Sequence, residues 1–269
     1  MDQLIERQRE FQRFVGFPID SILESDRNEM SEKYIFKMIE EAVELRREFP
    51  SSINPWSKHQ KTADLNRIKE EMSDVFLFFT NLLLVWKIDF ADFLDSARLV
   101  QERNFLKIKK KKMDFLNEEI LSIPGHTTGI GSGNLNPKYI FIGQNPGKGI
   151  THGYRFWSNT EDGSTKVLLP SIGDKVSDCY FTNLVKSTTI ENRQPSLEEV
   201  DFWIPFLQQE LQILLTSNHA KLISLGSWTY DKLNGCGYVS EQVPHPATVL
   251  YGSNTKESFD KAIETALDY

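Results

Sequence analysis

Acidic side chains recur at a spacing of three residues in two segments of the first half of the chain. The segment KMIEEAVELRRE contains Glu41 and Glu44, and IKEEMSDVFLFF contains Glu71 and Asp74. Residues i and i+3 share one face of a helix, so two such helices packed side by side would gather these carboxylates. Their mutual repulsion is relieved by a hard cation such as Mg2+, which could hold a triphosphate and orient an attacking water. A charged, solvated helix face is the alternative, but apolar neighbours on both segments leave limited room for it.

A glycine-rich loop in the second half follows the apolar run YIFIG, which is typical of a buried β-strand. The loop reads GQNPGKG from Gly143 to Gly149. A phosphate-binding loop of the Walker type needs four residues between its first glycine and a Gly-Lys-Ser/Thr sequence. Here Gly147 follows Gly143 too closely, and Gly149 takes the place of the Ser or Thr. The spacing excludes this kind of phosphate site, so the loop needs another explanation.

The two halves of the chain differ in hydrophobic periodicity. Residues 3–110 read as helices with almost no strand signal, whereas after residue 138 short apolar runs alternate with helical segments. The runs KYIFIG, DCYFTNLV and AKLISLG predict a parallel sheet, whose ligands would bind at the carboxyl ends of the strands. We therefore predict a multidomain chain. An all-α helical bundle would span residues 1–112, and a three-layer α/β domain with a parallel sheet would span residues 113–269.

The distribution of charge limits the classes of partner. The formal net charge of −7 falls on the second half, which argues against a strong non-specific DNA binder, because Lys and Arg contacts to phosphates supply most of that affinity. The basic run from Lys107 to Lys112 is either a solvated helix end or a contact to a phosphate backbone. The first residues lack the apolar core of a signal peptide, and no apolar run is long enough to span a bilayer. We expect a cytoplasmic protein that does not bind membranes.

The two cysteines, Cys179 and Cys236, lie far apart, and neither belongs to a CxxC motif or a Cys/His cluster. Thiolates alone therefore cannot assemble a zinc site or an iron–sulfur cluster. We expect two ordinary thiols, buried or partly buried, and no iron–sulfur cluster.

The first half resembles the all-α nucleoside triphosphate pyrophosphatases, especially the dimeric dUTPases and their MazG-like relatives. The likeness covers residues 3–105 and rests on both acidic motifs, on LIERQREFQ at the start, and on INPWSKHQ between the motifs. It implies Mg2+-dependent cleavage of deoxyuridine triphosphate or a related nucleotide. The implied metal ligands or metal-site bases are Glu41, Glu44, Glu71 and Asp74. The implied nucleotide-binding residues are Trp56 and, in QERNFLK, Arg103 and Asn104. Because two short helical pairs need a partner to complete a bundle, we expect a homodimer.

The second half resembles the uracil-DNA glycosylase superfamily, with family 4 as the nearest type. The likeness covers about residues 121–265 and rests on GQNPG, FTNLVK and PHPA, which occur in the order of that family. Glycosylases take a base out of the stack and hydrolyse its bond to the sugar. The resemblance implies that Asn145 holds the attacking water, that Asn183 reads the Watson–Crick edge of the base, and that His245 donates toward an oxygen of the leaving uracil. The other implied base-binding residues are Gln144 and a stacking platform, Phe156 or Trp157.

Two differences from family 4 bear on the chemistry. Family 4 enzymes carry an acidic residue where this chain has Gln144, and they carry an iron–sulfur cluster whose cysteines are missing here. The sequence NPG around Asn145 instead matches the mismatch-specific and single-strand-selective types. A neutral amide cannot accept a proton, so catalysis would depend on a base that is already dissociating. The resemblance therefore implies uracil or a modified pyrimidine in DNA as the expected substrate.

Together these patterns predict a bifunctional hydrolase. One half would remove a pyrimidine triphosphate before it enters DNA, and the other would excise the base once it has entered. Two alternatives stay open. One is a module that binds DNA, nucleotides or a protein without cleaving them. The other is a base-modification or defence role that acts on altered phage DNA.

Overall fold

The structure is a computed structural model of the chain. It describes residues 2–14, 19, 22–48, 64–147, 150–155, 163–216 and 219–268. Three residues of the predicted sites lie outside the described residues, namely Trp56, Phe156 and Trp157. The chain forms two compact units, Met1–Gln101 and Glu102–Tyr269, whose boundary falls inside one long helix. A domain boundary at residues 112 and 113 stays a prediction.

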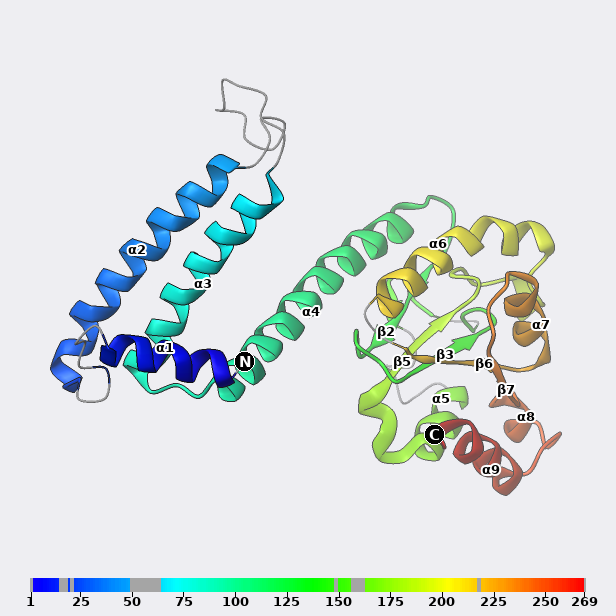
Figure 1. The fold of residues 1–269 in the computed structure, drawn as a ribbon. Coiled ribbons are helices and arrows are strands. Elements are labelled where there is room, and N and C mark those ends of the chain that lie inside the picture. The colour runs from blue at the N-terminus through cyan, green and yellow to red at the C-terminus, as the bar shows by residue number, and fades with distance from the viewer. Residues whose placement is uncertain are drawn as a thin grey trace. The chain divides into compact units, whose positions relative to one another are not determined.

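The first unit is helical, as the periodicity predicts. It contains α1 (Asp2–Phe14), a 3-10 helix (Glu24–Asp26), α2 (Arg27–Glu48), α3 (Leu65–Trp86) and the start of α4 (Phe90–Ser122) (Figure 1). The indole Nε1 of Trp86 donates to Ser31 Oγ at 2.7 Å, and Arg67 pairs with Glu48 at 3.7 Å. These contacts join the start of α2 to the end of α3 and the end of α2 to the start of α3, so the two helices are antiparallel.

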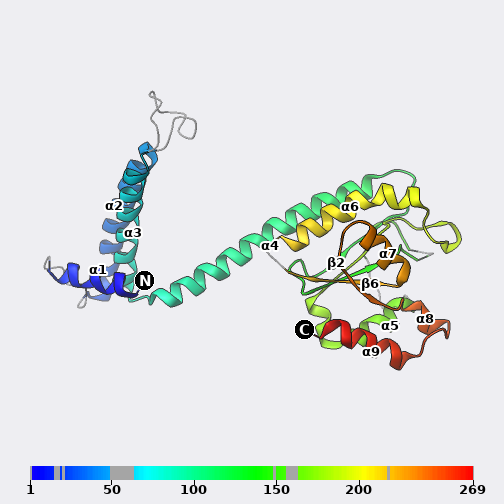
Figure 2. The same cartoon turned by 45° about the vertical axis from the view of Figure 1, so that its right-hand side comes forward.

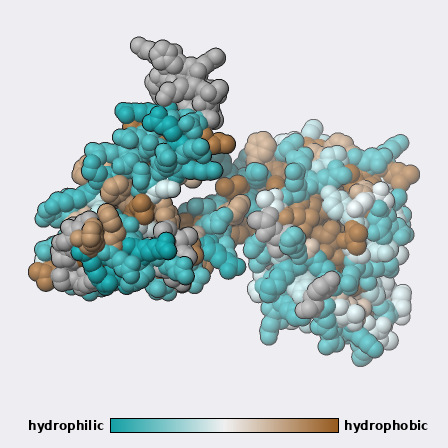
Figure 3. All heavy atoms as spheres, in the orientation of Figure 1, coloured by the Kyte–Doolittle hydropathy of each residue, from teal (hydrophilic) through white to brown (hydrophobic). Residues whose placement is uncertain are grey.

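Polar side chains fix the ends and the partners of α3. The side chain of Asp64 caps its first turn by accepting from the backbone N–H groups of Asn66 and Arg67. Two glutamines of α1, Gln8 and Gln12, donate to Asn81 Oδ1 at 2.9 and 3.1 Å and hold α1 against α3. Figure 3 shows hydrophobic residues interspersed among the hydrophilic ones on the surface of this unit. None of the described helices has an apolar stretch long enough to cross a lipid bilayer.

The second unit is an α/β domain with a five-stranded sheet in the order β2-β5-β3-β6-β7. Its strands are β2 (Ser132–Gly133), β3 (Tyr139–Gly143), β5 (Cys179–Asn183), β6 (Lys221–Leu225) and β7 (Glu241–Val243). The last four are mutually parallel, but β2 pairs antiparallel with β5, so the prediction of a purely parallel sheet is wrong. A side chain at Gly133 would place its Cβ 2.5 Å from the carbonyl oxygen of Cys179, so this edge pairing depends on glycine. A separate parallel pair joins β1 (Gly129–Ile130) to β4 (Tyr154–Arg155).

Helices cover both faces of the sheet and give the predicted three layers (Figure 2). One face packs on the second half of α4, α6 (Leu197–Leu215) and α7 (Ser227–Gly235). The other face packs on α5 (Gly163–Ile172) and α9 (Lys256–Leu267), with α8 (Ala247–Leu250) beside α5. Two 3-10 helices complete the unit, Gly173–Asp178 and Ile190–Asn192. Every residue of β3 is buried because both of its faces are covered, which explains its continuous apolar run.

A buried ion pair joins the segment after β5 to α6. Lys186 Nζ contacts Glu210 Oε2 and lies 2.5 Å from Thr182 Oγ1, and both charged side chains are almost fully buried. Glu210 also accepts from Thr182 Oγ1 and from the hydroxyl of Tyr180, each at 2.8 Å. A Cβ at Gly131 would lie 2.3 Å from Glu210 Oε1, so the network also requires this glycine. Burial lowers the pKa of Lys186, and the carboxylate of Glu210 opposes that shift.

Replacement of Lys186 tests this network. Lys186→Met should lower the free energy of unfolding by about 3–5 kcal/mol, because it leaves Glu210 buried without its countercharge. The matched control Lys166→Met removes an exposed lysine of α5 and should change stability by less than about 0.5 kcal/mol. Urea denaturation of both variants and the parent measures the difference. A parent-like stability of Lys186→Met would contradict a stabilising role of the pair of Lys186 and Glu210.

Candidate functional site

The order of the strands brings three predicted site residues to one edge of the sheet. Asn145 follows β3, Asn183 is the last residue of β5, and His245 follows β7. These strands are parallel and lie in the order β5-β3-β6-β7, so their carboxyl ends share an edge. With strands about 4.8 Å apart, β7 lies roughly 10 Å from β3. A ligand the size of a nucleotide could contact all three loops.

The GQNPG loop is held by the segment that follows β5. Gly143 is the register partner of Asn183, and beyond the strand ends the N–H groups of Leu184 and Val185 donate to the carbonyls of Gly143 and Gln144 at 2.9 and 3.0 Å. Gln144 is partly buried at the edge where the strands end. The start of the loop therefore continues the pairing of β3 with β5.

Two hydrogen bonds from its amide nitrogen orient the side chain of Asn145. Nδ2 donates to the carbonyl of Pro146 at 3.0 Å and to Thr189 Oγ1 at 3.4 Å. The amide oxygen has no hydrogen-bonding partner in the part of the chain that the structure describes. This arrangement leaves an acceptor that a water molecule could use.

Asn183 is buried, with 3% of its surface exposed, and its side-chain amide makes no hydrogen bond to any described residue. The amide of Asn183 is not among the fully buried polar groups that lack a partner, so its atoms reach solvent at the edge of the sheet. Asn183 therefore presents an amide donor and an amide acceptor to a ligand at the end of β5.

His245 is held in one tautomer by its own loop. The backbone N–H of Ala247 donates to Nδ1 at 3.2 Å, so in the neutral ring the proton is on Nε2. Gly226, after β6, donates to the carbonyl of Val243 at 2.8 Å and has a φ of 90°. A side chain at Gly226 would bring its Cβ to 3.4 Å from the Cβ of His245. That distance is an ordinary contact, so the positive φ is what favours glycine at this turn after the run LISL.

In the helical unit the structure gathers three of the four predicted carboxylates. Ligand oxygens of Glu41, Glu44 and Glu71 all lie within 4.8 Å of one another, but Asp74 does not join this group. Burial raises the pKa of Glu41, and the negative charges of Glu44, Asp74 and Glu71 raise it further. The oxygen donors suit a hard cation such as Mg2+.

The predicted residues Arg103 and Asn104 are exposed on α4. They belong to the second compact unit, whereas the carboxylates belong to the first.

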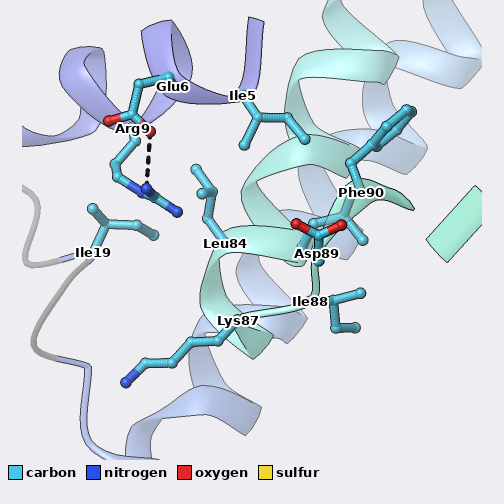
Figure 4. A pocket seen from close by; sticks show the side chains of 10 residues that line it. Ile5, Glu6, Arg9, Ile19, Leu84, Lys87, Ile88, Asp89 and Phe90 are labelled. Carbon is cyan, nitrogen blue, oxygen red and sulfur yellow. Dashed lines mark hydrogen bonds and ion pairs between the residues drawn. The ribbon is translucent and has the colours of Figure 1, made fainter. Parts of the chain in front are cut away.

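A cavity of about 520 Å³ lies elsewhere in the helical unit (Figure 4). Its apolar lining includes Ile5, Leu84 and Phe90, and its rim carries the ion pair of Glu6 with Arg9 at 2.9 Å. Leu84 and Glu71 lie near opposite ends of α3, roughly 20 Å apart along the helix axis. This cavity is therefore distinct from the carboxylate group.

One lysine in the basic run from Lys107 to Lys112 has a structural role that the sequence did not indicate. Lys109 is buried, and its Nζ donates to the carbonyl of Leu214 at 2.9 Å, at the end of α6. Burial lowers its pKa. Because α6 begins after the site edge of β5 and ends before the start of β6, its last turn lies near the opposite edge of the sheet. Lys109 is therefore neither solvated nor available to a DNA backbone at the site edge.

The two cysteines do not fit a four-thiolate cluster. Cys179 is buried in β5, where its thiol donates to the carbonyl of Lys175 at 3.1 Å, and burial raises its pKa to about 12. Cys236 is partly buried and its pKa is also raised, with burial as the main cause. Both thiols are therefore protonated at neutral pH. Both match the predicted burial of ordinary cysteines.

Comparison with known proteins finds similarity in the second unit. Residues 130–267 match the family model of the uracil DNA glycosylase superfamily, and no part of residues 1–129 is included in that match. The chain is also similar to the type-4 uracil-DNA glycosylase of Archaeoglobus fulgidus, with 26% identity over 150 residues. This similarity covers 48% of the chain and 75% of the relative. Through residues 130–267, the chain belongs to the uracil DNA glycosylase superfamily.

Proposed function

We propose that the second unit excises uracil or a related modified pyrimidine from DNA by hydrolysing the N-glycosidic bond. Membership of the superfamily indicates a DNA glycosylase, which is a hydrolase. The similar Archaeoglobus fulgidus protein is a type-4 uracil-DNA glycosylase by name. The observation that carries the proposal is the shared sheet edge of Asn145, Asn183 and His245.

The reaction would begin with a base that has left the stack. Among the described residues, neither the amide donor nor the amide acceptor of Asn183 has a hydrogen-bonding partner, and the two groups match the donor and acceptor edge of a pyrimidine. As the glycosidic bond breaks, negative charge develops on the base. The Nε2–H of His245 would donate to an oxygen of the departing base and stabilise that charge.

The amide oxygen of Asn145 would accept a hydrogen bond from the attacking water and aim it at the sugar carbon. An amide cannot take the proton of that water, so the proton passes to solvent after the base has begun to leave. Neutral Gln144 and Asn145 supply no general base in the loop. The neutral side chains at these two positions also favour the alternative of a module that binds DNA without cleaving it. Release of free base separates the two, and a panel of modified bases tests a defence role against altered DNA.

Substitution of Asn145 tests the proposal. Asn145→Ala removes the anchor of the water, and at about 2–4 kcal/mol this loss should slow excision by roughly two to three powers of ten. Asn145→Asp keeps the geometry and adds a proton acceptor, so excision should be retained or should rise. The measurement is single-turnover excision from uracil-containing oligonucleotides, followed by alkaline cleavage of the abasic strand. Equal rates for Asn145→Ala and the parent would mean that the loop is only structural.

For the helical unit we propose a Mg2+-dependent pyrophosphatase that acts on dUTP or a related nucleotide. Support comes from the grouping of Glu41, Glu44 and Glu71 and from the resemblance to dimeric dUTPases. These three carboxylates would hold Mg2+, which would bind the phosphates of the nucleotide when present. The two units would then act on the same pyrimidine before and after its entry into DNA.

Substitutions that remove the charge of a single carboxylate test the metal site. Glu41→Gln and Glu71→Gln should each abolish Mg2+-dependent hydrolysis of dUTP, because each removes a carboxylate from the group. The matched control Glu70→Gln changes an exposed neighbour on α3 and should retain the activity of the parent. Pyrophosphate release at saturating Mg2+ measures the effect, and circular dichroism checks that the variants are folded. Full activity of Glu41→Gln would exclude this site.

We also propose that the helical unit forms a homodimer. Four apolar side chains of α2 are more than 40% exposed, and they recur at helical spacing: Ile35, Phe36, Ile39 and Val43. Exposed apolar stripes of this kind are typical of interfaces. Light scattering of the full chain should therefore give twice the mass of one chain, and Phe36→Glu should shift it toward one. A monomeric parent with full activity would contradict the proposal.

A further inference from the structure

We infer that Thr189 is a positioning residue for the proposed excision, because its hydroxyl fixes the direction of the Asn145 amide. This inference rests on the proposed function of the second unit. Thr189 lies in the segment after β5 and is buried, with 5% of its surface exposed. Its Oγ1 lies between the amide nitrogen of Asn145, at 3.4 Å, and the carbonyl oxygen of Arg193, at 2.6 Å.

The chemistry of a hydroxyl determines which atom donates the hydrogen in each of these two contacts. Thr189 has one hydroxyl hydrogen, and the carbonyl of Arg193 can only accept, so that hydrogen is donated to Arg193. Toward Asn145 the hydroxyl presents its lone pairs. It therefore selects the nitrogen of the amide, and an amide turned by 180° would place two acceptors against each other.

A second hydrogen-bond acceptor favours the same orientation of the Asn145 amide. The carbonyl of Pro146 lies 3.0 Å from Asn145 Nδ2. Both hydrogens of the amide nitrogen are thus used on the protein side. The amide oxygen is left as the acceptor for the attacking water.

The carbonyl of Arg193 is itself held in place by α6. The guanidinium of Arg193 binds Glu199 through two bonds of 2.7 and 2.8 Å, and Ser196 and Glu199 form a capping box at the start of α6. Within the turn before Arg193, Glu191 has a φ of 55°, which a residue other than glycine adopts at a cost. The turn and the start of α6 therefore fix the position of the Arg193 carbonyl, and the hydroxyl of Thr189 links that carbonyl to the amide of Asn145.

An isosteric substitution separates this role from packing. Thr189→Val removes the acceptor and keeps the shape, so the amide should populate both directions and single-turnover excision should slow by about threefold to tenfold. Thr189→Ser keeps the hydroxyl and should excise at close to the parent rate. Thr188→Val changes the neighbouring threonine, which contacts Thr127 through its backbone, and should have no effect.

A double-mutant cycle distinguishes positioning from general damage. In an Asn145→Ala background, Thr189→Val should cause no further loss, because the amide that it orients is absent. The inference would be overturned by a parent-like rate of Thr189→Val, or by the same loss in both backgrounds.

A spectroscopic measurement tests the contact independently of activity. The side-chain amide signal of Asn145 in a 1H–15N spectrum, assigned by its loss in Asn145→Asp, should move in Thr189→Val and stay in place in Thr189→Ser. An unchanged signal in Thr189→Val would overturn the inference. If the parent releases no base from any substrate, the proposed function fails, and this signal still decides whether Thr189 orients the amide.

Discussion

The parallel register of β5, β3, β6 and β7 is the constraint on which the candidate site depends. Three loops that are far apart in the sequence meet only because their strands end at one edge of the sheet. The pairing of Gly143 with Asn183 continues beyond the strands through the bonds from Leu184 and Val185 to the GQNPG loop. A slip of one residue in β5 would turn Asn183 to the opposite face of the sheet and remove it from the site.

Helix α6 stabilises this arrangement at two points. The buried pair of Lys186 and Glu210 ties the segment after β5 to the second half of the helix, and Arg193 with Glu199 ties the same segment to its start. Thr189 lies between these two attachments and contacts Asn145. The side chain of Asn145, in the loop after β3, is therefore linked to α6 through the segment after β5.

The sequence predicts some of these features and not others, for physical reasons. The runs KYIFIG, DCYFTNLV and AKLISLG are continuous and apolar, so β3, β5 and β6 are expected. β2 and β7 are short, and β7 includes Glu241 and Gln242, so hydrophobicity gives no signal for them. The i, i+3 spacing predicts that Glu41 and Glu44 share a face, but only the pairing of α2 with α3 brings Glu71 to them. Thr189 and Lys109 could not be predicted, because their partners lie far away in the sequence.

If this sheet edge breaks the bond between a base and its sugar, free base must appear among the products. Mass spectrometry of the products after incubation with uracil-containing and modified-pyrimidine oligonucleotides tests it most directly. We expect free base together with an intact abasic strand, in equal amounts, from at least one of these substrates. Tight binding of the oligonucleotides with no free base from any of them would contradict base excision and leave a module that recognises DNA without cleaving it.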